Sequence, residues 1–173
     1  LPERKIVFAI VAAVISLTFL AFGRSLWQGF APLDDDMLIA HNLAVRGITA
    51  DHLRTVFTSY DPELYIPLTF VSYQINYLMG GLEPWIYHLT NLLLHAGNAL
   101  LIAWLLLLLT GKRSLSLLGG VLFAVHPLNT EAAVWLAGRK DLLSTFFALF
   151  TCIGYLRYRT GRRRWYWWSI AFF

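Results

Sequence analysis

Residues 87–109 read Y-H-L-T-N-L-L-L-H-A-G-N-A-L-L-I-A-W-L-L-L-L-L and contain no Asp, Glu, Lys or Arg. As an α-helix this stretch is about 35 Å long, enough to cross the roughly 30 Å hydrocarbon core of a bilayer. The whole chain has 173 residues, 58% hydrophobic and 14% charged, with a mean hydropathy of +0.59. A soluble domain of this size has no core large enough to bury so much apolar surface. The sequence therefore predicts an all-α, polytopic membrane protein.

Other apolar stretches are also predicted to lie in the membrane. They are residues 6–22, 115–125 or slightly longer, 142–158, and 165–173, where the chain ends within an apolar stretch. Residues 6–22 have the outline of a cleaved signal peptide, but they form a long stretch without a small-x-small cleavage site before Arg24. We therefore favour an uncleaved first span. Together these segments predict that residues 1–173 are the N-terminal part of one membrane domain in a longer protein.

Basic residues predict which helix ends face the cytoplasm. Three basic clusters fall on the same side of the predicted membrane: Arg4 with Lys5, Lys112 with Arg113, and the arginines of residues 157–164. Positively charged loops are retained in the cytoplasm, so residues 24–86 and 126–141 are predicted to be outward loops. The net charge of +4 is explained by these clusters, and nucleic acid is not an expected partner.

The first outward loop keeps helical periodicity. Thr49 is a predicted N-cap, and Pro67 suits a first helical turn. The apolar residues that follow recur at helical spacing until Gly80 and Gly81: Leu68, Val71, Ile75 and Leu78. This pattern predicts interfacial helices whose apolar stripe packs against lipid or protein.

Asp34, Asp35 and Asp36 form an acidic cluster near the start of this loop. Crowded carboxylates repel one another, so the group needs solvation, a cation or a shared proton. Beside a membrane it could take a proton from a substrate hydroxyl or organise the head group of a lipid-linked donor. An acidic turn that caps a helix is the alternative. No metal site is predicted from the sequence, and whether a divalent ion assists is left open.

His88, Asn91, His95 and Asn98 are spaced 3, 4 and 3 residues apart within the stretch 87–109. At 100° per residue they occupy about 80° of one helix face. Polar groups at membrane depth face other helices or a wet cavity, so interhelical hydrogen bonds and cavity lining both explain the stripe. His88 and His95 lie about 10.5 Å apart along the axis, too far to bind one ion together.

The second outward loop carries His126, Glu131, Arg139 and Lys140. Arg139 and Lys140 lie on the side where positive charge is disfavoured, which indicates that a phosphate or the acidic cluster retains them. A surface pair of Arg139 or Lys140 with a nearby Asp is the alternative, and it would contribute little. Glu131 is near a helix start, where its charge could simply stabilise the helix dipole.

Four segments in this order resemble a known family. They are L-D-D-D-M-L-I-A-H-N-L-A-V (residues 33–45), Y-I-P-L-T-F-V-S-Y (65–73), L-E-P-W-I-Y-H-L-T-N-L-L-L-H (82–95) and F-A-V-H-P-L-N-T-E-A-A-V-W-L-A-G-R-K-D-L-L-S (123–144). The chain from about Gly29 to Tyr158 resembles the bacterial relatives of the TMTC proteins. These are O-mannosyltransferase-like enzymes of the GT-C superfamily that usually carry C-terminal tetratricopeptide repeats.

The resemblance implies a GT-C-like transmembrane helix bundle in a bacterial inner membrane. It implies inverting transfer of a sugar, most plausibly mannose, from a polyprenyl-phosphate donor to Ser or Thr hydroxyls of an acceptor protein. Asp34 and Asp35 match the paired acidic motif of the family, so one of them would be the general base. No other cofactor is implied.

The same resemblance implies substrate contacts elsewhere. Arg139 and Lys140 match the basic pair that would hold the donor phosphate, and His126 and Glu131 match an H-P-x-x-x-E pattern that would position donor or acceptor. Independently of the resemblance, the polar stripe on residues 87–109 makes His88 and His95 further candidates for substrate binding, if the stripe lines a cavity. One position departs from the pattern, because Ile66 stands where relatives often carry Arg or His, and this bears on donor binding. Asp36 falls on a variable position of the pattern and is ranked below Asp34 and Asp35.

Two other functions remain open at this stage. A non-catalytic membrane anchor for a C-terminal repeat domain would make the polar clusters structural relics. A transporter or channel would require charged residues along several spans, and the predicted spans contain almost none.

Overall fold

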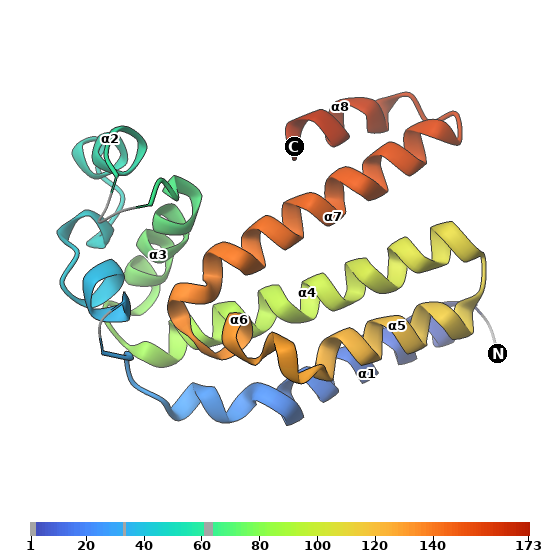
Figure 1. Ribbon diagram of the computed structural model, residues 1–173, viewed down its shortest axis with the longest axis horizontal. Coiled ribbons are helices and arrows are strands. Elements are labelled where there is room, and N and C mark those ends of the chain that lie inside the picture. The colour runs from blue at the N-terminus through green and yellow to red at the C-terminus, as the bar shows by residue number, and fades with distance from the viewer. Residues whose placement is uncertain (1–2, 33, 61–63) are drawn as a thin grey trace.

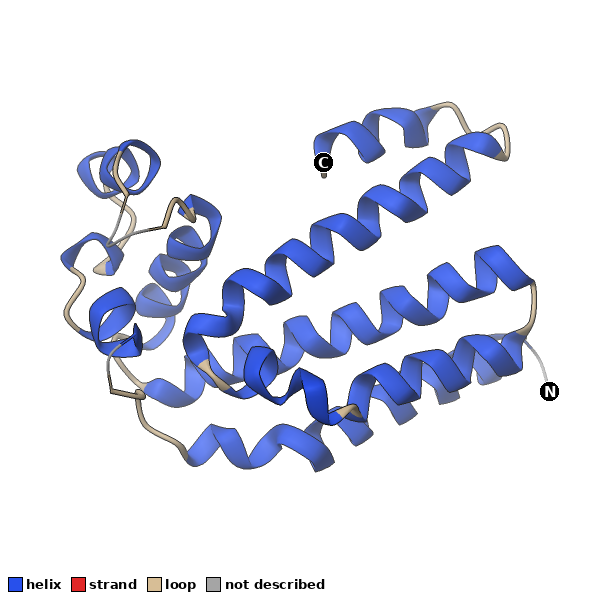
Figure 2. Cartoon of the chain, viewed as in Figure 1, coloured by secondary structure: helices blue, strands red, loops and turns tan. Residues whose placement is uncertain are grey.

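The computed structural model describes residues 3–32, 34–60 and 64–173. Within these ranges the chain is helical and contains no strand, as Figure 2 shows. The prediction of an all-α fold is confirmed.

The long helices coincide with the predicted apolar stretches. They are α1 (Glu3–Phe22), α4 (Pro84–Thr110), α5 (Arg113–Val125) and α7 (Arg139–Arg159), followed by the short α8 (Arg164–Ala171). Among the described residues, Val7–Trp27 and Pro84–Thr110 are long and apolar enough to cross a membrane. The first is longer than predicted, because the 3-10 turn Gly23–Trp27 prolongs α1.

The shortest predicted span is completed by a bent segment. Helix α5 is followed, after a 50° bend, by the segment Pro127–Val134, and the pair is a third candidate for crossing the membrane. The bend follows from Pro127, which cannot continue a helix ladder with a backbone N–H. Helix α7 covers the predicted span 142–158 but does not reach the apolarity of the other candidates, so its crossing stays a prediction.

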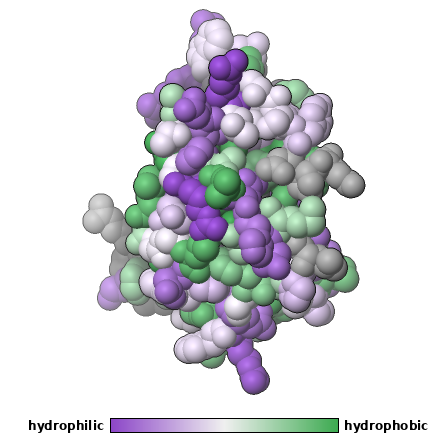
Figure 3. Space-filling model, turned by 90° about the vertical axis from the view of Figure 1, so that its left-hand side faces the viewer, coloured by the Kyte–Doolittle hydropathy of each residue, from purple (hydrophilic) through white to green (hydrophobic). Residues whose placement is uncertain are grey.

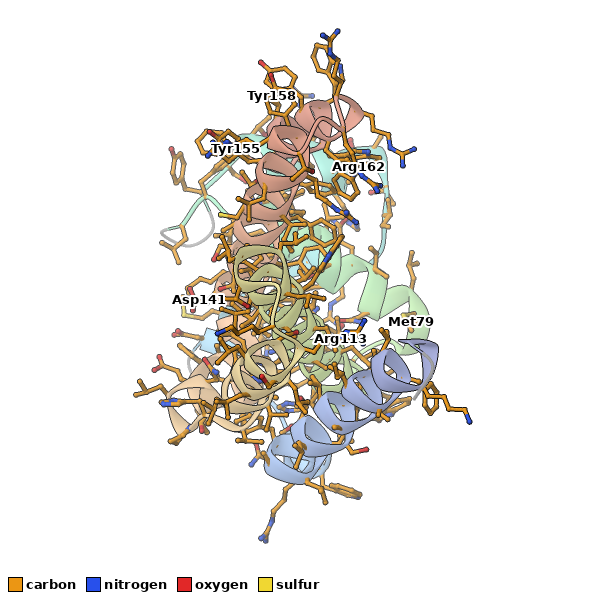
Figure 4. The ribbon with its side chains drawn as sticks, turned by 90° about the vertical axis from the view of Figure 1, so that its right-hand side faces the viewer. Met79, Arg113, Asp141, Tyr155, Tyr158 and Arg162 are labelled. Carbon is orange, nitrogen blue, oxygen red and sulfur yellow. The ribbon has the colours of Figure 1, made fainter. Side chains whose placement is uncertain are left out.

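The helices give the molecule two different ends (Figure 1). Helices α1, α4 and α5 lie side by side, and α7 packs on α4 and diverges from it toward the right of the view. We call the left-hand end, with α2 (Ala50–Thr58), α3 (Pro67–Gly80) and α6 (Thr130–Val134), the loop end. The opposite end, the arginine end, carries Arg113 and Arg162, which Figure 4 labels. The segments predicted to share one membrane side thus share one end of the molecule.

Small residues let α4 and α5 approach closely. A Cβ atom on Gly120 would lie 2.9 Å from the Cβ of Ala103 and 3.2 Å from the carbonyl oxygen of Ala99. One turn earlier, the buried Ser116 hydroxyl donates a 2.7 Å hydrogen bond to the Ala103 carbonyl. Close backbone approach with an interhelical hydrogen bond is typical of helix pairs in membranes.

Helix α3 carries an exposed apolar stripe and buries polar as well as aromatic side chains. Leu68, Ile75 and Leu78 are 52%, 47% and 63% exposed, whereas Gln74 and Asn76 are buried. Its start at Pro67 and the capping of α2 by the Thr49 hydroxyl, which accepts from the His52 N–H at 3.1 Å, were predicted correctly. The exposed stripe suits a helix that contacts lipid or protein.

The buried cation Arg139 joins α7 to α3 and α4. Its side chain is 0% exposed. Nε donates to the Asn91 amide oxygen at 2.8 Å and Nη2 to the Tyr87 carbonyl at 2.7 Å, both on α4. Nη1 donates to the Asn76 amide oxygen and, at 3.2 Å, to the Ser72 hydroxyl, both on α3. A buried charge is tolerated when its donors are satisfied in this way.

We predict that replacing Arg139 by Ala destabilises the protein by about 3 kcal/mol or more, because several charge-assisted hydrogen bonds vanish and buried amide oxygens lose their donor. Arg159→Ala, at the exposed end of α7, is the matched control and is expected to be nearly neutral. Denaturant unfolding of the full-length protein in detergent measures the difference. Equal stability of the two variants would contradict the role of Arg139.

Candidate functional site

The buried carboxylate of Asp35 connects the two loops that meet at the loop end. Its side chain is 1% exposed. Oδ2 accepts from the Ala31 N–H at 2.8 Å, and Oδ1 accepts from the Ala137 N–H at 3.0 Å. The second bond joins residues 102 positions apart in the sequence. Asp35 therefore aligns the start of the first predicted outward loop with the end of the second.

A glycine brings the Ala137 N–H to this position. The turn Leu136–Gly138 lies between α6 and α7. A Cβ atom on Gly138 would lie 2.9 Å from Cα of Ala132 and 2.9 Å from the Glu131 carbonyl oxygen, both backbone atoms. Any larger residue would push the turn away from α6 and carry the Ala137 donor away from Asp35.

Burial raises the pKa of the Asp35 carboxyl above its ordinary value of 3.8. The N–H groups of Ala31 and Ala137 lower the pKa, and the like charges of Asp34 and Asp36 raise it again. The net direction is upward, because loss of solvation disfavours the charged form more than the two donors favour it. A carboxylate of this kind is a stronger base than an exposed aspartate.

Asp35 lines a pocket of about 280 Å³ at the loop end. We call this space the Asp35 pocket. Its wall combines acidic, imidazole, indole and amide side chains: Asp35, Glu131, His88, Trp135 and Gln28. Figure 3 views the molecule from this end, where hydrophilic and apolar residues are interspersed over the surface. Among the described residues that line the pocket, none is a Lys or Arg.

The four polar residues of the stripe on α4, His88, Asn91, His95 and Asn98, have two different roles. Asn91 donates to the Trp135 carbonyl at 3.0 Å, and Asn98 donates to the Leu142 carbonyl at 2.9 Å. His95 Nε2 lies 3.1 Å from the Ala124 carbonyl, between the rings of Phe22 and Phe123. These three residues hold helices together.

His88, in contrast, faces the Asp35 pocket and is 2% exposed. The carbonyls of Gly29 and Val134 lie beside its ring, but neither ring nitrogen makes a hydrogen bond of ordinary geometry within the described residues. Of His88 and His95, the two histidines predicted to line a substrate cavity, the structure brings only His88 to the pocket.

The two residues of the basic pair, Arg139 and Lys140, also lie in different surroundings. Arg139 is buried, and its contacts to α3 and α4 turn it away from the described pockets. Lys140 is partly exposed, and its Nζ lies 5.2 Å from the centroid of the Trp135 ring. It also donates to the Ala137 carbonyl at 3.2 Å and lies 4.0 Å from a carboxylate oxygen of Asp141. Lys140 is thus the member of the pair that stands next to the Asp35 pocket.

The remaining predicted site residues lie around or outside the pocket. Asp34 is half-buried in the turn before Asp35. Asp36 faces His41 at 3.7 Å. Glu131 lines the pocket with an exposed side chain, whereas His126 is exposed and lines a different hollow beside Gly119 and Leu122. The structure does not bring His126 to Asp35, because its ring turns back to accept from the Leu128 N–H at 3.3 Å.

Sequence reasoning assigned no function to Trp135 or Gln28, although both line the pocket. Trp135 lies in the second loop between Glu131 and Arg139, and an aromatic residue between two candidate ligands was the signal available for it. Gln28 lies beyond the first apolar stretch and carried no such signal. Within the described ranges, no group of three or more His, Cys, Asp or Glu side chains converges as a metal site.

The curated proteins that this chain resembles are named protein O-mannosyl-transferases. The chain is 42% identical over 98 residues to the protein O-mannosyl-transferase tmtc2 of Xenopus laevis, covering 57% of this chain and 12% of the relative. It is 32% identical over 160 residues to TMTC3 of Mus musculus (87% and 17%) and 35% identical over 160 residues to Tmtc1 of Drosophila melanogaster (88% and 18%).

No family model and no solved structure matches the chain. The chain spans less than a fifth of the length of these curated relatives. The curated homologues of this helical, membrane-type chain are thus the TMTC protein O-mannosyl-transferases, at 30–42% identity over most of its length.

Proposed function

We propose that this chain forms part of a GT-C-type membrane glycosyltransferase that transfers mannose from a polyprenyl-phosphate donor to Ser or Thr hydroxyls of proteins. The observation that carries the proposal is the buried Asp35 carboxylate in the wall of a polar pocket, in a chain whose relatives are named protein O-mannosyl-transferases. The loop end faces the non-cytoplasmic side of the membrane, since the arginine end carries the positive charge.

Asp35 acts as the general base. Each of its oxygens accepts one backbone N–H, so lone pairs remain for the proton of an acceptor hydroxyl. As that proton moves to Asp35, the acceptor oxygen forms a bond to the anomeric carbon, and the bond from this carbon to the donor phosphate oxygen breaks. The electron pair leaves with polyprenyl phosphate, and attack opposite the leaving group inverts the anomeric centre.

Neighbouring groups support this step. Asp34 shares the turn with Asp35, and its charge helps to raise the pKa of the base. The leaving phosphate gains negative charge, and the Lys140 ammonium, fixed beside Trp135, stabilises this charge. Glu131 and His88 contact the substrate from the pocket wall. Arg139 is a positioning residue that holds the turn of Ala137 in place.

We predict that Asp35→Asn lowers kcat for transfer from polyprenyl-phosphate mannose by about 10²- to 10⁴-fold, the usual contribution of a general base. Asp34→Asn is expected to have a smaller effect, because Asp35 lines the pocket. Mass spectrometry of an acceptor peptide incubated with the full-length protein follows the product.

Asp51→Asn, on the exposed side of α2, is the matched control, and thermal unfolding shows whether each variant is folded. If folded Asp35→Asn protein transfers sugar at the wild-type rate, Asp35 is not the base. If wild-type protein transfers nothing from this donor, the proposed donor or activity is wrong.

The raised pKa of Asp35 predicts the acidic limb of the pH–rate profile. The base works only as a carboxylate, so kcat/KM falls as pH drops through a pKa that lies above 3.8. Asp36→Asn removes a like charge that raises this pKa, so the limb should shift toward lower pH. A limb that stays in place or shifts upward in this variant would contradict the assignment.

A further inference from the structure

We infer that the Asp35 pocket is the subsite for the sugar ring of the donor, with Trp135 as its stacking plane and His88 as a hydrogen-bond partner for sugar hydroxyls. This inference rests on the proposed function and adds to it the recognition of the sugar, which the similarity to relatives does not assign to any residue. Four features of the pocket carry it.

The first feature is the size of the pocket. Its volume of about 280 Å³ lies just below the roughly 300–1,000 Å³ found for pockets that hold drug-sized ligands. A single sugar ring fits a space of this size. An acceptor peptide in an extended form does not fit inside and would have to reach Asp35 from the mouth of the pocket.

The second feature is the charge of the wall. Asp35 and Glu131 bring carboxylates to the pocket, and no Lys or Arg is among its described lining residues. A phosphate inside would meet these acids without a cation to balance it. The donor phosphate therefore binds near Lys140, which lies beside the Trp135 ring, outside the pocket. The pocket itself suits an uncharged polyol, because its hydroxyls can donate hydrogen bonds to the two carboxylates.

The third feature is the unsatisfied imidazole. His88 is 2% exposed and lines the pocket; the carbonyls of Gly29 and Val134 lie beside its ring, but neither ring nitrogen makes a hydrogen bond of ordinary geometry within the described residues. Leaving such a group unpaired is costly. A neutral imidazole offers one donor and one acceptor, and a pair of sugar hydroxyls can use both.

The fourth feature is the rigid indole. The backbone of Trp135 is held in place, because its backbone N–H donates to the Glu131 carbonyl at 3.1 Å and its backbone carbonyl accepts from the Asn91 side chain at 3.0 Å. Lys140 Nζ lies 5.2 Å from the ring centroid, which restrains the side chain further. The negative face of an aromatic ring attracts the C–H groups on one face of a sugar, so a fixed indole selects the orientation of the ring.

The test compares two lipids that differ only in the sugar. Full-length protein in detergent is titrated with radiolabelled polyprenyl-phosphate mannose and, separately, with polyprenyl phosphate. His88→Phe and Trp135→Leu should each weaken binding of the mannose-bearing lipid by about tenfold or more, the effect of one lost contact of about 1.4 kcal/mol. Binding of the sugar-free lipid should not change in His88→Phe and should fall by a clearly smaller factor in Trp135→Leu, where Lys140 loses its contact with the indole; this retained binding also shows that the variants are folded.

Two further variants sharpen the comparison. Lys140→Gln should weaken binding of both lipids by a similar factor, because the phosphate is common to them. Trp167→Phe, at an exposed position of α8, is the control for loss of an indole and should bind like wild type. If a variant at His88 or Trp135 fails to bind either lipid, His88→Gln and Trp135→Phe replace them and should show a smaller but still sugar-dependent loss.

Each result decides one of the two proposals. Wild-type protein that binds neither lipid and transfers no sugar would overturn the proposed function. Wild-type protein that binds and transfers mannose, while the His88 and Trp135 variants lose nothing or lose affinity for both lipids equally, would leave the function intact and overturn the sugar subsite.

Discussion

The Arg139 guanidinium holds together the three helices that surround the turn above the Asp35 pocket. It lies at the start of α7, and its donors bind side chains and a carbonyl of α3 and α4. The ring of Tyr73 lies 4.6 Å from it and adds a cation–π contact. Because these contacts fix the first residue of α7, the preceding turn has one position, and in that position the Ala137 N–H reaches Asp35. A buried cation without these partners would be strongly unfavourable, so loss of one contact destabilises the whole junction.

The surroundings of Asp35 act on its carboxylate in two opposing ways: backbone donors stabilise the charged form, and burial disfavours it. Two backbone donors hold it in a fixed orientation, and burial keeps it a better base than a solvated acid. The loops that provide these donors come from two separate parts of the sequence, and the long helices α1, α4 and α7 bring them to the same end of the molecule. Fixed orientation on rigid elements is what a site for proton transfer needs, since small displacements of the base reduce the rate.

The sequence predicted the helices well and the site only in part. Hydropathy located the long helices, and Thr49 and Pro67 marked the starts of α2 and α3, because these signals are local. Spacing placed His88, Asn91, His95 and Asn98 on one face of α4, but which of them meets a cavity depends on where the second loop packs. Likewise, Arg139 and Lys140 are adjacent and equally basic in sequence. Their different surroundings arise from α3 residues more than 60 positions away, which no local pattern reveals.

The most direct measurement is a cryo-electron microscopy map of the full-length protein with polyprenyl-phosphate mannose bound to the Asp35→Asn variant, which should not turn the donor over. We predict density for the sugar ring in the Asp35 pocket, in contact with Trp135 and His88, with the phosphate next to Lys140 and residue 35 facing the anomeric carbon from the opposite side. Donor density elsewhere in the protein, with the Asp35 pocket empty or filled by another segment of the chain, would contradict it.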